Sequence, residues 1–195
     1  MISYGSRSND QLLQYYGFVE KNNTHDVYVM PPLREWDIDA LETACGRSFG
    51  ADRLVKVDRA GLLGNTREVQ NDEDDEGSSS GDGIIITKAG GIDPAVLQAL
   101  RALVSSETEW KTAGEAIGNF VERVSEENEK LARLAARCQI EIELDAKPTT
   151  MEEDEKILKQ MKSNKSMAGS VEEILSLQFR IEKKKLLINA ISELQ

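Results

Sequence analysis

Apolar residues recur every three or four positions from residue 93 to the end of the chain, a spacing that places them on one face of a helix. Asp93 and Pro94 begin the first such segment as N-cap and first helical residue. A long segment follows from Glu126 to about Asp145. Thr150 and Ser170 each precede a glutamate by three residues, the capping-box pattern that begins a helix. The second half of the chain is therefore predicted to be helical.

The later helices carry aliphatic faces. The helix after Thr150 is predicted to bury Ile157, Leu158 and Met161. The last helix has a heptad-like series, Ile174, Leu177, Ile181, Ile188 and Ile191, which indicates packing against neighbouring helices. Lys184 falls at a seam position and argues against an isolated coiled coil. A weaker helix is predicted over residues 112–124, where two glycines interrupt the pattern.

The first half of the chain has shorter patterns. Ile2 to Tyr4 has the character of a strand end, and Asn9 is a suitable N-cap for a helix that Gly17 closes after Tyr16. Residues 25–30 are predicted to form a strand, and Asp37 is predicted to cap a short helix.

Two further strands are predicted at Leu54 to Val57 and Ile84 to Thr87, paired as a β-hairpin. Between them, residues 71–83 read NDEDDEGSSSGDG, a composition that cannot bury a core and predicts a disordered loop. A solvated insertion is favoured over mimicry of an anionic ligand, because long loops add little closure entropy. The predicted fold class is mostly α: a bundle of about five helices with a small β-hairpin.

The net charge of −11 and the absence of a basic stripe with interleaved aromatics argue against a nucleic-acid partner. The basic run Lys183-Lys184-Lys185 is interpreted as a solvated helix face. Cys45 and Cys138 lack the spacing of a zinc site, so no metal is predicted, and two reduced, buried thiols indicate an intracellular protein. The sequence contains no transmembrane run or signal peptide, which predicts a soluble protein without a membrane partner.

Two tyrosines occupy positions where regular structure is predicted to end. Tyr4 closes the first strand and Tyr16 ends the first helix. Functional side chains often lie at such places, because a rigid scaffold there meets open space. The alternative is core packing of both rings, with each hydroxyl bound to a backbone group.

Residues 2–20, ISYGSRSNDQLLQYYGFVE, favour the functional reading. This string resembles the C-terminal end of the SET domain in the branch that contains the Rubisco large-subunit lysine methyltransferases and the actin-histidine methyltransferase. The run from Thr149 to Asp154, TTMEED, is similar to a motif in the helical substrate-binding domain of the same family. The region from Leu33 to Gly91 matches the family poorly.

The resemblance implies roles for four residues. Tyr4 corresponds to the catalytic tyrosine, whose hydroxyl lines the methyl-transfer channel and orients the incoming nitrogen. Phe18 corresponds to the aromatic that packs on the adenine of S-adenosylmethionine. Tyr16 and Arg7 correspond to substrate-binding positions. A phenol suits this chemistry, because the displacement at a sulfonium needs alignment and a polar channel more than a strong base.

The family's glycine-containing cofactor loop and asparagine–histidine motif have no counterpart in this sequence. We therefore expect residues 1–32 to be a SET-domain remnant and residues 33–195 to be the helical substrate-binding domain. Met1 to about Asn9 is expected to be loosely held, because upstream strands would normally support it.

The expected function is recognition of a protein substrate for S-adenosylmethionine-dependent lysine methylation, without activity or bound cofactor in this chain alone. Lysine is favoured over histidine as the target because YYGF at residues 15–18 resembles the lysine-modifying relatives. The alternative is a scaffolding protein that self-associates through its last helix. The sequence leaves open the substrate, the oligomeric state, and whether the compartment is chloroplast, cytoplasm or nucleus.

Overall fold

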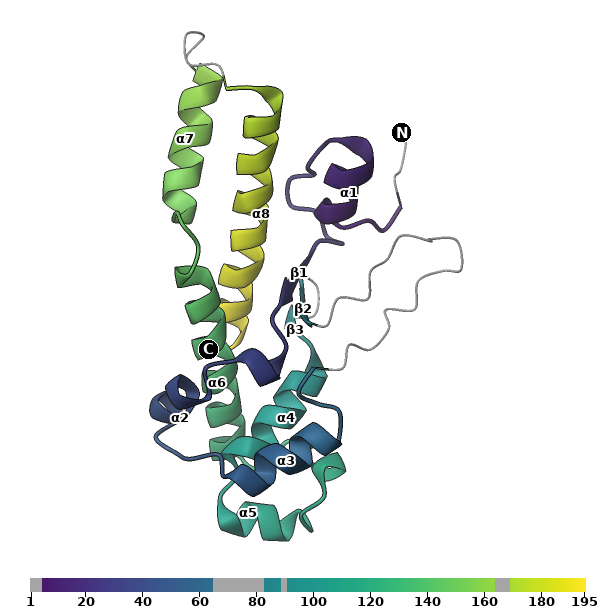
Figure 1. The fold of residues 1–195 in the computed structure, drawn as a ribbon, viewed down its shortest axis with the longest axis vertical. Coiled ribbons are helices and arrows are strands. Elements are labelled where there is room, and N and C mark those ends of the chain that lie inside the picture. Colours follow the sequence, from purple (N-terminus) through teal and green to yellow (C-terminus); the bar gives the residue numbers. More distant parts are fainter. Residues whose placement is uncertain (1–4, 65–82, 89–90, 164–168) are drawn as a thin grey trace. The chain divides into compact units, whose positions relative to one another are not determined.

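The structure is a computed structural model that describes residues 5–64, 83–88, 91–163 and 169–195 (Figure 1). Tyr4 and most of the predicted acidic loop at 71–83 lie outside the described residues. The described helices are α1 Asn9–Tyr16, α2 Ile38–Cys45, α3 Ala51–Arg59, α4 Pro94–Val104, α5 Glu107–Thr112, α6 Glu126–Asp145, α7 Met151–Ser163 and α8 Val171–Glu193, with 3-10 helices at Leu33–Glu35 and Ile117–Phe120. The strands β1 Val27–Met30, β2 Ile84–Thr87 and β3 Gly91–Ile92 form a sheet in the order β1-β2-β3. The mostly α prediction is confirmed.

The chain divides into two compact units. Unit 1 consists of Met1–Tyr28, Ile86–Gly91 and Ile140–Glu193, and unit 2 consists of Val29–Ile85, Ile92–Gln139 and Leu194–Gln195. Each is therefore assembled from segments that are distant in the sequence. The division into a SET-domain remnant over residues 1–32 and a helical substrate-binding domain over residues 33–195 stays a prediction.

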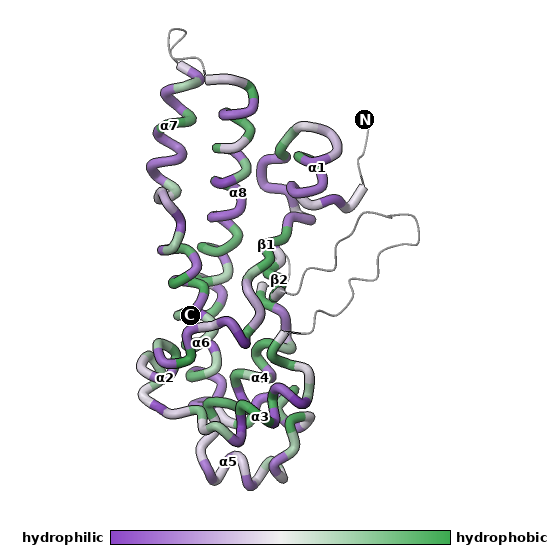
Figure 2. Tube along the Cα trace, viewed as in Figure 1, coloured by the Kyte–Doolittle hydropathy of each residue, from purple (hydrophilic) through white to green (hydrophobic). Residues whose placement is uncertain are grey.

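The helical hairpin α7–α8 forms much of unit 1 (Figure 1). The predicted capping boxes are present: the Glu153 amide donates to the Thr150 hydroxyl over 3.1 Å, and the Glu173 amide donates to the Ser170 hydroxyl over 3.2 Å. Along α8, apolar positions alternate with polar ones, whereas α7 is mostly hydrophilic (Figure 2). The predicted buried face of α7 is only half-buried at Ile157, Leu158 and Met161.

Helix α1 begins one residue earlier than predicted. Ser8 is the N-cap and forms a capping box with Gln11, so the prediction of Asn9 as cap is wrong. Asn9 instead is fully buried at the first helical position, where its side chain bonds to residues outside the helix. Gly17 ends the helix with a φ of 68°, the left-handed conformation predicted for it.

Unit 2 has a core around α4, in which Leu100, Leu103 and Phe120 are fully buried. The predicted strand at Leu54 to Val57 is wrong, because these residues lie in α3. Helical spacing places Arg53 and Val57 on one buried face of α3, and the Arg53 guanidinium donates to the Ser105 carbonyl. These tertiary contacts outweigh the strand propensity of the two valines.

The predicted helix over residues 112–124 is also wrong. Helix α5 ends at Thr112, and Gly114 has a φ of 63°, which breaks the helical path. The helix begins at a capping box of Ser106 and Glu109, a pattern that is visible in the sequence. Asp93 caps α4 and Pro94 follows it, as predicted.

Candidate functional site

Three of the four predicted site residues lie together around the end of α1. The guanidinium carbon of Arg7 lies 5.7 Å from the centre of the Tyr16 ring, within the range of a cation–π contact. The rings of Tyr16 and Phe18 have centroids 6.4 Å apart. Tyr16 is 46% exposed, so it does not pack in the core. Tyr4, the predicted catalytic residue, lies outside the described residues.

Asn9 fixes the backbone on both sides of this cluster. Its backbone amide donates to Asp26 Oδ1 over 2.9 Å, and its side-chain Nδ2 donates to Asp26 Oδ2 over 2.8 Å. The Glu20 amide donates to the Asn9 side-chain oxygen over 2.9 Å. Asn9 therefore joins the start of α1 to the segment that follows Phe18. The expectation that the chain is loosely held as far as Asn9 is wrong at that residue.

Lys183 of α8 completes this polar network. Its Nζ lies 2.8 Å from Asp26 Oδ1 and 2.6 Å from the Val27 carbonyl oxygen, and it also pairs with Asp10. Lys183 and Lys184 are buried, so the interpretation of the basic run as a solvated helix face is wrong. A buried ammonium is tolerated only when acceptors surround it, and here they come from the N-terminal segment. Sequence reasoning could not find these partners, because they are distant along the chain.

The loop after α1 is attached to α8 at a second place. The Asn22 amide donates to Glu182 Oε2 over 2.8 Å, while Glu182 Oε1 accepts from Lys185 over 2.8 Å. The Asn23 side chain donates to the Arg7 carbonyl oxygen over 2.8 Å. The backbone of Arg7 is thus tied to the same loop that α8 supports.

The TTMEED run has a structural explanation. Lys184 Nζ lies 2.6 Å from Asp154 Oδ2 and 3.0 Å from the Thr149 hydroxyl, and it also donates to the Thr149 and Thr150 carbonyl oxygens. The Thr149 hydroxyl donates to Asp154 Oδ1 over 2.8 Å, and Arg180 pairs with the same carboxylate. Burial alone would raise the pKa of Asp154, but hydrogen bonds from Arg180, Lys184 and Thr149 outweigh it and hold the pKa below its ordinary value.

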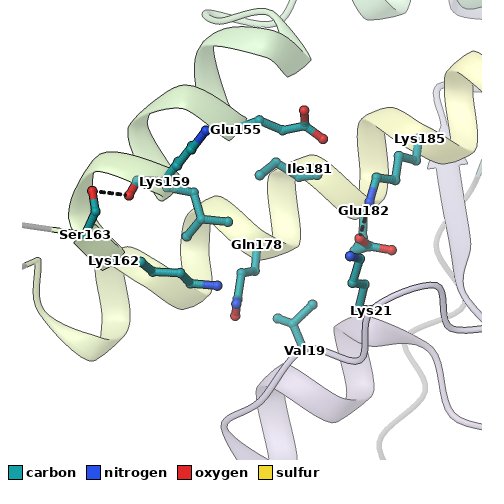
Figure 3. A pocket seen from close by; sticks show the side chains of 11 residues that line it. Val19, Lys21, Glu155, Lys159, Lys162, Ser163, Gln178, Ile181, Glu182 and Lys185 are labelled. Carbon is teal, nitrogen blue, oxygen red and sulfur yellow. Dashed lines mark hydrogen bonds and ion pairs between the residues drawn. The ribbon is translucent and has the colours of Figure 1, made fainter.

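A groove of about 480 Å³ lies between α7, α8 and the segment that follows Phe18 (Figure 3). We call it the α7–α8 groove. Its apolar surface comes from Val19, Leu158 and Ile181. The polar residues that line it are Lys21, Glu155, Lys159, Lys162, Ser163, Gln178, Glu182 and Lys185. This groove could not be predicted from the sequence, because its residues come from three separate segments.

The described residues contain no group of three or more His, Cys, Asp or Glu side chains placed to hold a metal ion. None of the described helices is both long and apolar enough to cross a membrane. Cys45 and Cys138 are half-buried thiols. Burial raises the pKa of the Cys45 thiol, with a smaller contribution from Cys138, so Cys45 is held in the neutral form.

Comparison with solved structures gives the fold an independent reference. The chain is similar to the protein in the crystal structure of the SET domain of LSMT bound to MeLysine and AdoHcy, with a TM-score of 0.56 and 18% sequence identity. The match covers 100% of this chain and 39% of that chain, so the protein described here spans about two fifths of its structural neighbour. At this identity the likeness concerns the fold. No curated protein sequence matches the chain.

A match to a family model shows the family of this chain. The model for Rubisco LSMT substrate-binding matches residues 58–187, a region that extends from the end of α3 into α8 and includes the TTMEED run. Because the matched region covers more than half of the 195 residues, the chain belongs to the Rubisco LSMT substrate-binding family.

Proposed function

We propose that this chain recognises the protein substrate of a SET-type, S-adenosylmethionine-dependent protein-lysine N-methyltransferase. The observation that carries the proposal is the match of residues 58–187 to a substrate-binding family. The structural neighbour is a SET domain bound to methyllysine and AdoHcy, which supports the same chemistry. Lysine is the proposed target, on the basis of the YYGF string at residues 15–18.

The N-terminal segment is proposed to contribute to the site of methyl transfer. Tyr4 would orient the incoming amine, and Phe18 would cover the adenine of the cofactor. Tyr16 and Arg7 would contact the substrate, a role that suits the exposure of Tyr16 and the contact between the two side chains. S-adenosylmethionine would supply the methyl group.

We propose that residues 1–195 alone bind substrate without transferring a methyl group. No segment of the sequence resembles the family's cofactor loop or its asparagine–histidine motif. Nucleic acid is not a proposed partner, because a net charge of −11 repels phosphate.

The test is capture of a substrate by the immobilised 195-residue chain from an extract of its source cells, followed by mass spectrometry. We expect a captured protein that carries methyllysine and that binds again after purification. An unrelated acidic helical protein of similar size is the matched control for charge-driven capture. Capture of the same proteins by both would contradict the proposal.

A further inference from the structure

We propose that the α7–α8 groove binds an acidic segment of a protein partner and holds an apolar side chain of that segment on its floor. The inference rests on the proposed function, because the partner it describes is the protein substrate. The acidic segment would belong to that substrate and would lie away from the residue that is methylated.

The floor of the groove accepts an apolar side chain. Val19 and Leu158 are half-buried, and Ile181 is 4% exposed. Figure 3 shows Val19 on one side of the opening and Gln178 and Ile181 on the other. A volume of about 480 Å³ is within the range of pockets that enclose a ligand or a few side chains.

The rim carries an excess of positive charge. Four lysines and two glutamates line the groove. Both oxygens of Glu182 already accept hydrogen bonds, from the Asn22 amide and from Lys185. Among the residues that the structure describes, the side chains of Lys21, Lys159 and Lys162 form no ion pair or hydrogen bond.

This local charge is opposite in sign to the net charge of the chain, which is −11. Lysines near the end of α7 are favourable to that helix by themselves, because they face its negative end. Lys21 comes from a different segment, however, and it lines the same groove as Lys159 and Lys162. This convergence favours an anionic occupant, since opposite charges across an interface steer association and set specificity.

The groove is also connected to the predicted site of methyl transfer. Val19 follows Phe18 directly, and the Lys21–Asn22 segment is held to α8 through Glu182. A substrate segment in the groove therefore contacts the backbone that carries the aromatic cluster. Binding there would contribute affinity independently of the target lysine.

The test uses the 195-residue chain and a fluorescein-labelled peptide in which two leucines are flanked by glutamates. We expect saturable binding by fluorescence anisotropy that weakens when KCl is raised from about 50 to about 500 mM. Peptides with lysine in place of glutamate, or serine in place of leucine, should bind at least about tenfold more weakly, because each removes one of the two complementary features.

Charge reversal locates the binding surface. The double variant Lys159→Glu, Lys162→Glu should weaken binding of the acidic peptide about tenfold, since two attractions become repulsions. Lys156→Glu is the matched control, because Lys156 is exposed on the same helix but does not line the groove. It should leave the affinity within about twofold of the parent chain. Circular dichroism confirms that all three proteins are equally helical.

Three results would overturn the inference: equal binding of acidic and basic peptides, equal weakening by Lys156→Glu, or binding of phosphatidylserine vesicles in place of the peptide. The groove and the proposed function can fail separately. If a captured methylated protein binds the parent chain and the double variant equally, the groove is not its binding site, and the proposed function still stands. Failure to capture any methylated protein would contradict the proposed function. The peptide measurements would then show by themselves whether the groove binds acidic segments.

Discussion

Lys184 Nζ lies 2.6 Å from Asp154 Oδ2, and the two side chains are only 5% and 0% exposed. Removing two charges from water is costly, and their attraction offsets this cost only when the remaining donors and acceptors are satisfied. Here the threonine pair at 149–150 accepts from the ammonium, while Thr149 and Arg180 donate to the carboxylate. The pair therefore fixes the start of α7 against α8.

Replacement of one partner should be strongly destabilising. We expect Asp154→Ala to lower the free energy of unfolding by about 3–5 kcal/mol, because it leaves Lys184 buried without a counter-charge. Urea denaturation followed by circular dichroism measures the change. Lys156→Ala, on the exposed face of α7, is the control and should change stability by less than about 0.5 kcal/mol. A similar small change for Asp154→Ala would show that the pair contributes little.

The same carboxylate predicts a dependence of stability on pH. Hydrogen bonds hold the pKa of Asp154 below its ordinary value despite burial, so its contribution is fully present above the unfolded-state pKa of about 3.9. The contribution is lost as the pH falls through the lower folded-state pKa. Below about pH 4, the parent chain should therefore lose stability more steeply than Asp154→Asn, which cannot titrate at this position. Parallel curves for the two proteins in urea titrations at several pH values would contradict this.

The polar network of Asn9, Asp26 and Lys183 should control the order of α1. We expect Lys183→Met to leave Asp26 buried without its cation and to loosen the first helix. Hydrogen exchange of the amides in residues 9–20 should accelerate, while exchange in α4 stays unchanged. Gln14→Ala, at an exposed position of α1, is the matched control. Unchanged protection of α1 in Lys183→Met would show that apolar contacts such as Leu12 are sufficient.

The proposal that this chain alone does not use the cofactor predicts a negative result in calorimetry. S-adenosylmethionine should show no micromolar binding to residues 1–195, and Tyr4→Phe should leave stability and peptide binding unchanged. Micromolar binding that Phe18→Ala weakens would instead demonstrate a complete cofactor site. Gln14→Ala would again serve as the control, because it lies on the exposed side of α1.

Self-association through the last helix makes a different prediction from internal packing. Ile181 is 4% exposed inside the chain, so we expect Ile181→Glu to destabilise the monomer, since it buries an unpaired charge. Scaffolding through α8 would instead require a dimer that Ile181→Glu and Ile188→Glu dissociate without loss of helicity. Sedimentation equilibrium together with circular dichroism separates the two outcomes.

The features that could be predicted from the sequence are those set by neighbouring residues. Asp93 with Pro94, and the capping boxes at Thr150 and Ser170, gave helix starts within a residue, because caps act on the amides next to them. The strand predicted at residues 54–57 is wrong, because the local strand preference of Val55 and Val57 does not decide the structure there. The buried contacts of Arg53 and Val57 in α3 become visible only in the folded chain.

The burial of Lys183 and Lys184 could not be predicted for the same reason. A lysine run on a helix is usually solvated, and the carboxylates that surround these two lie 157 and 30 residues away. Lys184 at an apolar seam position was the one local sign of a buried role. The α7–α8 groove could not be predicted for a related reason, because Val19 and Leu158 are far apart in the sequence.

The attachment of α1 to α8 has a consequence for how the protein is made. Asp26 and Lys183 are separated by 157 residues, so the first helix leaves the ribosome long before its anchor exists. At about 5–20 residues per second, this interval lasts roughly 8–30 s. Throughout that time the carboxylates of Asp10 and Asp26 lack their lysine partner. Unit 1 can close only after translation of α8, which makes the last helix the element that completes the fold of the first.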